Sequence, residues 1–507
     1  MNNNQNYINL IYKIASIGIM FVITMIITKI VVYYLGQEIY GYYDLSNDFV
    51  NYASIISVAL NSMASRYITI SYYSNKDDLN CYFNSVLFSN IILAISLIVP
   101  FFLLVLNLNN IININYEYII EIKILFALML INFLLSIITS IFGVATFTKN
   151  RVDLDSQRQI ECWGIRLIII IVFYFLFDPH IWYLGVGVLI SNFYVFFRNY
   201  FYTVRLLPEI KISIHYFKFS YVKELIVNGI WNSFTKIGSV LLTGLDLFIS
   251  NLIISPAAMG ILSLSKTIPK YILNSMGSLS SVFSPSLTIS YAQKDNETLK
   301  KVLDNSMRIN IFIMIIIVTF MLMYGETFFI FWIPNVDSKL IHIITIITIS
   351  SYTILMPLES LWSIYTVTNK VKVSSIYLTL EAAIRILIVY IFIRFFSTES
   401  DKIFFLVGTT AFFEIIRGLF FLPITISSYV KIKIKFFYIR LLRGFICLSI
   451  TCFIVYVLPE VHINVLFDLF FGALKIVIIA SVVCALFLLN KDEKSNLKIF
   501  ISKRRIK

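Results

Sequence analysis

Three cations, Arg66, Lys266 and Lys270, lie within long apolar stretches of this 507-residue sequence. A charged side chain in the middle of a membrane costs at least ~2.5–3.5 kcal/mol, so it faces protein or water and usually has a function. Arginine and lysine in such places are suited to bind an anionic group. The residues expected to share this binding cavity with them are Asn47, Asn51, Ser62, Asn274 and Lys236.

Two acids in apolar stretches, Asp246 and Glu359, have no obvious partner nearby in the sequence. A buried carboxylate without a counter-ion could carry a proton or bind Na⁺. The alternative is an ion pair with Lys236 or with another cation of the cavity. The acid–base pairs that lie one helical turn apart, and are expected to neutralise each other, are Glu381 with Arg385 and Glu414 with Arg417.

The composition identifies the surroundings of these residues. The chain is 59% hydrophobic and 14% charged, with a mean hydropathy of +0.85, whereas about a quarter of a soluble chain is charged. We therefore predict an all-α polytopic membrane protein with about fourteen transmembrane helices. The expected spans are 8–35, 43–73, 82–106, 118–146, 159–177, 182–206, 222–253, 260–291, 304–332, 339–368, 373–396, 403–428, 440–458 and 464–489.

The net charge of +13 is explained by the loops, so nucleic acid is not expected as a partner. Cations gather in every second loop, for example at Arg151, Lys211, Lys370 and Lys433, and again in the C-terminal tail. The remaining loops are short and almost free of cations. Because cytoplasmic loops are enriched in Lys and Arg, both termini are predicted to be cytoplasmic, in an inner or plasma membrane.

Metal and disulfide chemistry are not indicated. The five cysteines form no CxxC motif, and the four histidines are scattered singly. We expect no catalytic residue, no metal site and no cofactor, with an H⁺ or Na⁺ gradient as the coupling to consider. The N-terminal "MNNNQNY" is polar and uncharged, and the apolar stretch after it is too long for a signal peptide, so it should insert as the first span.

The sequence contains an internal repeat. "TISY" occurs at 69–72 and again at 288–291, an offset of 219, and 11 of the 32 residues of 41–72 are identical at this offset without a gap. The copies fall in the second and eighth spans, so an even number of spans separates them and both run in the same direction. This predicts two six-helix lobes related by a parallel pseudo-repeat, followed by two additional C-terminal helices. The expected divisions are 1–215, 216–430 and 431–507.

Helical spacing places a polar stripe on each copy. The first stripe contains Asn47, Asn51, Ser62 and Arg66, and the second contains Lys266, Lys270 and Asn274. Two related stripes favour a shared aqueous cavity, and polar helix–helix packing is the alternative. The height difference between Lys266 and Arg66 corresponds to ~28 Å of helix, which would spread cations along a translocation path.

Four segments carry a resemblance to a known superfamily. They are "YYLGQEIYGYYDLSNDF" (33–49), "ALNSMASRYITISYYSNKD" (59–77), "GLDLFISNLIISPAAMGILSLSKTI" (244–268) and "FSPSLTISYAQKDNE" (283–297). Over residues 8–430 the chain resembles the multidrug/oligosaccharidyl-lipid/polysaccharide exporter superfamily. Within that superfamily it looks like the Wzx-type flippases for lipid-linked oligosaccharides.

The resemblance implies a bundle that alternates between inward-open and outward-open states. Its cargo would be an undecaprenyl-pyrophosphate-linked oligosaccharide, moved across the cytoplasmic membrane of a bacterium for capsule, O-antigen or exopolysaccharide assembly. Membrane lipid, a polysaccharide polymerase and glycosyltransferases would be its further partners.

Two other functions stay open. A multidrug exporter of the same fold usually takes cationic cargo and should carry acids in its first span, but this span has Lys13 and Lys29 and no acid. A membrane polysaccharide polymerase or glycosyltransferase typically has a large outer loop or an acidic catalytic pair in one, whereas the predicted outer loops are short.

Overall fold

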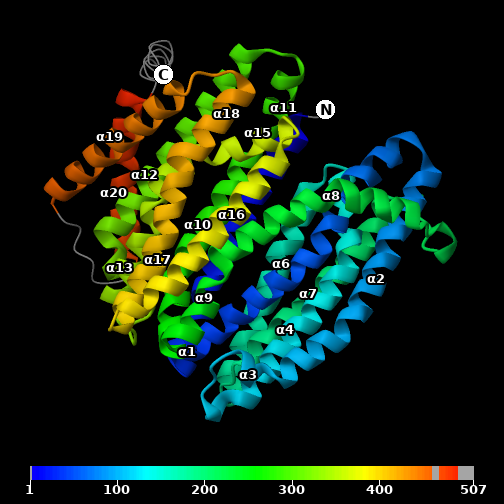
Figure 1. Cartoon of the computed structure of the whole chain (residues 1–507), viewed down its shortest axis with the longest axis horizontal. Coiled ribbons are helices and arrows are strands. Elements are labelled where there is room, and N and C mark those ends of the chain that lie inside the picture. The colour runs from blue at the N-terminus through cyan, green and yellow to red at the C-terminus, as the bar shows by residue number, and fades with distance from the viewer. Residues whose placement is uncertain (1–2, 460–466, 489–507) are drawn as a thin grey trace, which may run out of the picture. The chain divides into compact units, whose positions relative to one another are not determined.

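The computed structural model describes residues 3–459 and 467–488, and within these ranges the secondary structure is helical, with no strand (Figure 1). The predicted all-α class is confirmed. The elements of the first part are α1 (Asn3–Ser74), α2 (Lys76–Leu106), α3 (Leu108–Ile111), η1 (Tyr116–Tyr118), α4 (Ile119–Ser140), η2 (Ile141–Gly143), α5 (Val144–Thr148), α6 (Val152–Leu176), α7 (Trp182–Leu206) and η3 (Ile214–Tyr216).

The second part of the chain contains two π-helical turns, η4 and η5, in its first long helical stretch. Its elements are α8 (Phe219–Ser239), η4 (Val240–Gly244), α9 (Asp246–Ile249), η5 (Ser250–Ile254), α10 (Pro256–Ser281), α11 (Ser284–Ala292), α12 (Asn296–Trp332), α13 (Ser338–Ser350), α14 (Tyr352–Leu358), η6 (Glu359–Leu361), α15 (Trp362–Val367), α16 (Val371–Phe392), η7 (Ile393–Phe395), α17 (Glu399–Ile416), η8 (Arg417–Phe421), α18 (Leu422–Val430), α19 (Lys435–Val457) and α20 (Asp468–Phe487). Helices satisfy every backbone group internally, as a chain surrounded by lipid requires.

The described residues contain ten helices long and apolar enough to cross a bilayer, or eleven if the bent pair Ser338–Ser350 and Tyr352–Val367 is one span. The multi-pass character is confirmed. The stretch Ile11–Ser74 counts once in that number, although its 64 residues far exceed the ~20 needed for one crossing. It is interrupted at Gly36 (φ 84°, ψ 170°), a conformation that only glycine adopts readily. Gly36 directly follows the predicted span 8–35, and the count of fourteen stays a prediction.

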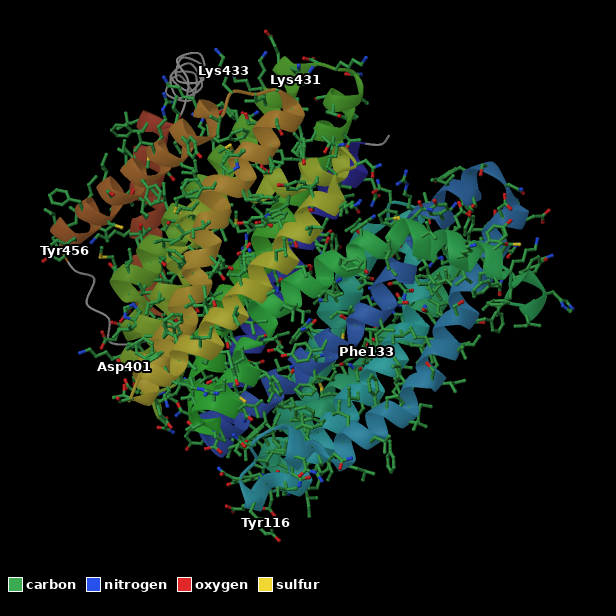
Figure 2. The ribbon with its side chains drawn as sticks, viewed as in Figure 1. Tyr116, Phe133, Asp401, Lys431, Lys433 and Tyr456 are labelled. Carbon is green, nitrogen blue, oxygen red and sulfur yellow. The ribbon has the colours of Figure 1, made fainter. Side chains whose placement is uncertain are left out.

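The C-terminal predictions fall partly outside the described residues. Positions 464–466 and 489 of the last predicted span and the basic tail at 503–507 lie there. The described helices α19 and α20 pack on each other and on α12 (Figure 1). Figure 2 shows Lys431 and Lys433 beyond the end of α18, and Tyr456 at the far end of α19.

The internal repeat extends through the helix boundaries. The helices α4 and α13 begin at Ile119 and Ser338, which are separated by the offset of the sequence repeat. The helices α6 and α16 begin at Val152 and Val371, and the same offset separates them. The break at Gly36 has its counterpart at the extended residue Ser255, which separates η5 from α10. The duplication therefore covers much more of the chain than the 41–72 segment.

The turns repeat as well. Asn150 and Asn369 are both left-handed, with φ of 52° and 55°, and each lies just before α6 or α16. Asparagine tolerates this conformation better than most residues do. In each turn the following backbone N–H reaches back along the chain, from Arg151 to the Thr146 carbonyl (2.8 Å) and from Lys370 to the Tyr365 carbonyl (2.7 Å). This is the closure expected where a left-handed residue ends a helix.

Two repeat-related pairs of residues touch each other. A Cβ atom added to Gly41 would lie 2.9 Å from Cα of Gly260, so the backbones meet where neither residue has a side chain. One turn further on, Ser263 donates a hydrogen bond to the Asp44 carboxylate, and the repeat offset again separates these two residues. Equivalent residues meet in this way where two copies of an element are related by a pseudo-two-fold axis.

The chain forms two compact units, residues 1–264 with 371–403, and residues 265–370 with 404–507. In the first, apolar side chains of α1, α2 and α8 form a buried cluster around Ile68, Phe83 and Leu225. In the second, α12, α14, α18 and α19 enclose another cluster around Leu358 and Phe437. These units follow packing, whereas the predicted divisions after 215 and 430 follow the repeat and stay predictions.

Candidate functional site

The predicted polar stripe of α1 is partly a helix–helix contact. Lys236 of α8 donates to Oδ1 of Asn51 (3.4 Å), and Asn232 donates to Oγ of Ser62 (3.1 Å). The helices approach closely here, because Gly229 of α8 has no side chain where it meets the Ala59 carbonyl of α1. Three predicted site residues, Asn51, Ser62 and Lys236, thus lie in the contact between α1 and α8. Ser62 is exposed beside this contact, and the choice between packing and a cavity stays a prediction.

The other two predicted site residues of α1, Asn47 and Arg66, lie in different surroundings. Asn47 donates to the Tyr43 carbonyl of its own helix (3.0 Å) and is half-buried. Arg66 is exposed, further along the same helix. A guanidinium at this position cannot face hydrocarbon cheaply, so it borders water, a polar headgroup or a bound anion.

The second unit contains the predicted residues of the other stripe. Lys266 is half-buried, whereas Lys270 and Asn274 are exposed, and all three lie on one face of α10. Their spacing places each side chain one turn from the next. The helix ends at Ser281, and Pro285 lies in the first turn of the next helix, α11.

Asp246 has a partner that is distant in the sequence. Its carboxylate forms an ion pair with Arg385 of α16, and both side chains are 0% exposed. Arg385 also donates to the Leu242 carbonyl, which belongs to the π-helical turn η4. Because a π turn shifts backbone hydrogen bonding from the α-helical pattern, it can leave a carbonyl oxygen available to a side chain. Arg385 was expected to pair with Glu381, and the structure places Asp246 among its partners.

Glu359 lies at the start of η6 in the second unit, beside a second group of buried charges. Glu414 accepts a hydrogen bond from Ser351 (2.6 Å) and lies 3.6 Å from Arg417. Glu359 interacts electrostatically with both Arg417 and Glu414. Its Oε1 atom would lie 3.7 Å from a Cβ atom added to Gly277 of α10. The two carboxylates and one guanidinium are thus neighbours, and the described residues contain no group of three ligands suited to a metal ion.

One charged residue of the first unit was missed at the sequence level. Arg166 is half-buried near the middle of α6, with its guanidinium carbon 4.3 Å from the centre of the Trp163 ring. Glu161 of the same helix accepts from Tyr194 (2.5 Å) and lies 3.5 Å from Arg198 of α7. The signal that could have revealed Arg166 was available, since Ile165–Arg166 recurs as Ile384–Arg385 at the repeat offset.

The C-terminal helix α19 is attached to α12 by charged contacts. Arg440 of α19 lies 2.5 Å from Asp304 of α12, and Arg308 lies 3.2 Å from the same carboxylate. These side chains are about nine-tenths buried. A paired, buried group of this kind is expensive to break by removing one partner.

Charged groups in the loops have a capping role. Asp295, between α11 and α12, accepts from the Thr298 backbone N–H at 2.9 Å, and these hydrogen bonds hold the pKa of its carboxyl group below the ordinary value. Asp153 forms a two-pronged contact with Arg151 and raises the pKa of that guanidinium. Asp295 thereby caps the start of α12, and Asp153 pairs with Arg151 in the first turn of α6.

Comparisons with known proteins agree on the fold. No protein-family model matches the chain. The membrane protein EpsK of Bacillus subtilis is 24% identical over 284 residues, which is 56% of this chain and 56% of that protein. The chain thus matches little more than half the length of this curated relative.

The similar solved structures are transporters. The lipid II flippase MurJ, in an inward closed conformation, matches 94% of this chain and 98% of its own, with a TM-score of 0.68 and 14% identity. A multidrug resistance MATE family transporter of the MOP superfamily, in an inward-facing conformation, matches 82% and 96%, with a TM-score of 0.63 and 12% identity. The protein is therefore a multi-pass membrane protein with the fold of MOP-superfamily transporters.

Proposed function

We propose that this chain is a flippase for lipid-linked oligosaccharides, of the Wzx type. It moves undecaprenyl-pyrophosphate-linked repeat units across the bacterial cytoplasmic membrane by alternating access, for capsule, O-antigen or exopolysaccharide assembly. The observation that carries the proposal is the cationic character of its membrane-embedded residues. Arg66 and Lys270 are exposed and Arg166 is half-buried, and the helices that carry Arg66 and Arg166 are apolar enough to cross a membrane.

The chemistry of such a cargo matches these residues. Pyrophosphate is anionic and forms charge-assisted hydrogen bonds with guanidinium and ammonium groups. The sugars would be bound by neutral groups such as Asn47 and Asn274. We infer that Arg66, Lys266 and Lys270 act on the charged part of the cargo at successive heights. Ser62 is exposed, whereas Asn51 and Lys236 are half-buried and would become more accessible if the contact between α1 and α8 opens.

The similarity to a flippase supports the same assignment. MurJ, whose name states a lipid cargo, is matched over 94% of this chain, whereas the MATE transporter is matched over 82%.

A multidrug exporter is the second candidate, because the MATE transporter shares the fold with a TM-score of 0.63. The charges argue against it. No Asp or Glu occurs on α1 before Glu38, whereas cationic drugs would be favoured by acids there.

Ion coupling is a separate proposal, and Glu359 is its stronger candidate. This carboxylate interacts with the Glu414 carboxylate as well as with Arg417, so protonation or Na⁺ binding would relieve repulsion between the two carboxylates. Asp246 remains a coupling proposal too, but a cation there would compete with Arg385.

The test uses purified protein in proteoliposomes that contain an undecaprenyl-pyrophosphate-linked oligosaccharide. Access of an external glycosidase to the glycan, with and without an imposed pH or Na⁺ gradient, reports movement. We expect movement that requires the protein and a gradient dependence that Glu359→Gln removes. Export of ethidium with no glycan movement would favour the drug exporter. Movement independent of any gradient would remove the coupling role.

A further inference from the structure

The repeat relates Arg166 to Arg385. The repeat offset separates the two residues, and they occupy the same place on α6 and α16, whose first residues are separated by the same offset. Each lies ~21 Å along its helix from the first residue. The neighbouring elements also correspond, since α6 packs against α1 whereas α16 packs against α8. The two arginines are therefore duplicates of one another.

Their electrostatic surroundings differ. Arg385 is fully buried and forms an ion pair with Asp246, which lies in the long helical stretch that begins with α8. The corresponding part of α1 contains no Asp or Glu from Asn3 to Gly36, and the repeat aligns Asp246 with the buried Ile27. The copy in the first half of the chain has lost, or never had, the carboxylate that neutralises the arginine.

The acids of α6 itself have other partners, and Asp153 of its first turn pairs with Arg151. Glu161 lies on a different face of α6 and contacts Arg198 and Tyr194. Asp155 forms an ion pair with Arg158. Among the described residues, Arg166 has an aromatic contact with Trp163 and no carboxylate partner. Its Nε atom is buried and has no hydrogen-bond acceptor in the same part of the chain.

We propose that Arg166, supported by Trp163, is an oxyanion-binding site inside the membrane-spanning part of the first unit. The half-buried guanidinium offers donors in a planar fork that fits a phosphate or a carboxylate. The indole ring holds it from one side, which fixes its direction without neutralising its charge. The bound anion replaces the internal carboxylate that Asp246 provides for Arg385.

This inference rests on the proposed function and names the chemical group that the first half of the chain recognises. An oxyanion of the cargo has two sources, the pyrophosphate of the lipid carrier and the carboxylate of an acidic sugar. A cationic drug would be repelled at this position.

The test measures binding to full-length protein in detergent. The probes are undecaprenyl pyrophosphate, a glucuronate-containing tetrasaccharide and uncharged undecaprenol. We expect Arg166→Gln to weaken at least one anionic probe about tenfold or more and to leave undecaprenol unchanged, as loss of a charge-assisted hydrogen bond predicts. Arg166→Lys should retain part of the affinity. Loss confined to the pyrophosphate identifies the carrier as the source, and loss confined to the tetrasaccharide identifies the glycan.

Two variants complete the design. Arg394→Gln is the matched control, because Arg394 also stacks on an aromatic ring, that of Tyr390 at 5.0 Å, but lies at the end of its helical segment. Trp163→Phe keeps an aromatic ring beside Arg166, so it should still bind the anionic probes. It also removes the indole whose fluorescence would change when a probe binds at this position. If folded Arg166→Gln protein binds both anionic probes as tightly as wild type, the inference is wrong. If wild type binds them through Arg166 but moves no lipid-linked glycan, the proposed function fails and the site stands.

Discussion

The helices α6 and α16 show how one duplicated position acquires two uses. On α16, Arg385 is sealed between Asp246 and a backbone carbonyl. On α6, Arg166 is half-buried over Trp163, and the helix packed beside it carries no acid before Glu38. Arg385 has its counter-ion, Asp246, within the same chain. Under the proposed function, Arg166 would receive its counter-ion from an anionic cargo.

A second comparison points the same way. The repeat aligns Pro285 with Arg66 in the sequence. It also aligns Lys266 with Asn47 and Lys270 with Asn51. Gly41 and Gly260, which are shared, lie where the backbones of their helices meet. The duplicated residues thus build the scaffold, and the residues that differ set the charge along it.

The largest effect is expected from breaking the sealed pair. Arg385→Ala removes the guanidinium that pairs with the buried carboxylate of Asp246, which should cost roughly 3–5 kcal/mol of stability. Thermal unfolding of detergent-purified protein checks this, with Arg394→Ala, on the turn that follows α16, as the control. The double variant with Asp246→Asn should recover much of the loss. A single variant as stable as wild type would contradict the structural role of Arg385.

The difference between Arg166 and Arg385 can be tested by introducing an acid on α1 at Ile27, the position that aligns with Asp246. Ile27→Asp should pair with Arg166, and it should abolish transport by occupying the proposed oxyanion site. A double-mutant cycle with Arg166→Gln should give a favourable coupling of about 1–3 kcal/mol. Purely additive effects would show that the two positions do not face each other.

A smaller effect is expected where the copies touch. A Cβ atom on Gly260 would lie 2.5 Å from the Gln37 carbonyl, so Gly260→Ala should overpack this contact and cost about 1–3 kcal/mol. Gly408→Ala is the matched control, because nothing lies within 4 Å of a Cβ atom there. Equal unfolding temperatures for the two variants would contradict the close approach.

Much of the fold was predictable because lipid imposes simple rules. Apolar runs had to become helices, and the repeat at 41–72 was visible in identical residues. The pairing of Asp246 with Arg385 was not predictable in the same way, because the partners are far apart in the chain and short-range spacing favours Glu381. Arg166 was overlooked because the repeat was aligned only over its most identical segment.

The polar stripes show another limit of sequence reasoning. Helical spacing correctly grouped Asn51 and Ser62 on one face of α1, but spacing does not say what that face meets. The structure places Lys236 and Asn232 of α8 against it. Exposed Arg66 and Lys270 are the residues for which a cargo-facing role is still the better prediction.

The central claim is that cations inside the membrane carry an anionic, lipid-linked glycan. The most direct measurement is glycan export by cells that carry Arg66→Glu or Lys270→Glu, compared with Lys211→Glu, which reverses an exposed cation of the connection between α7 and α8. The account predicts that both membrane variants are present at normal levels and export no glycan, while the Lys211 variant exports normally. Full export by both membrane variants would contradict it.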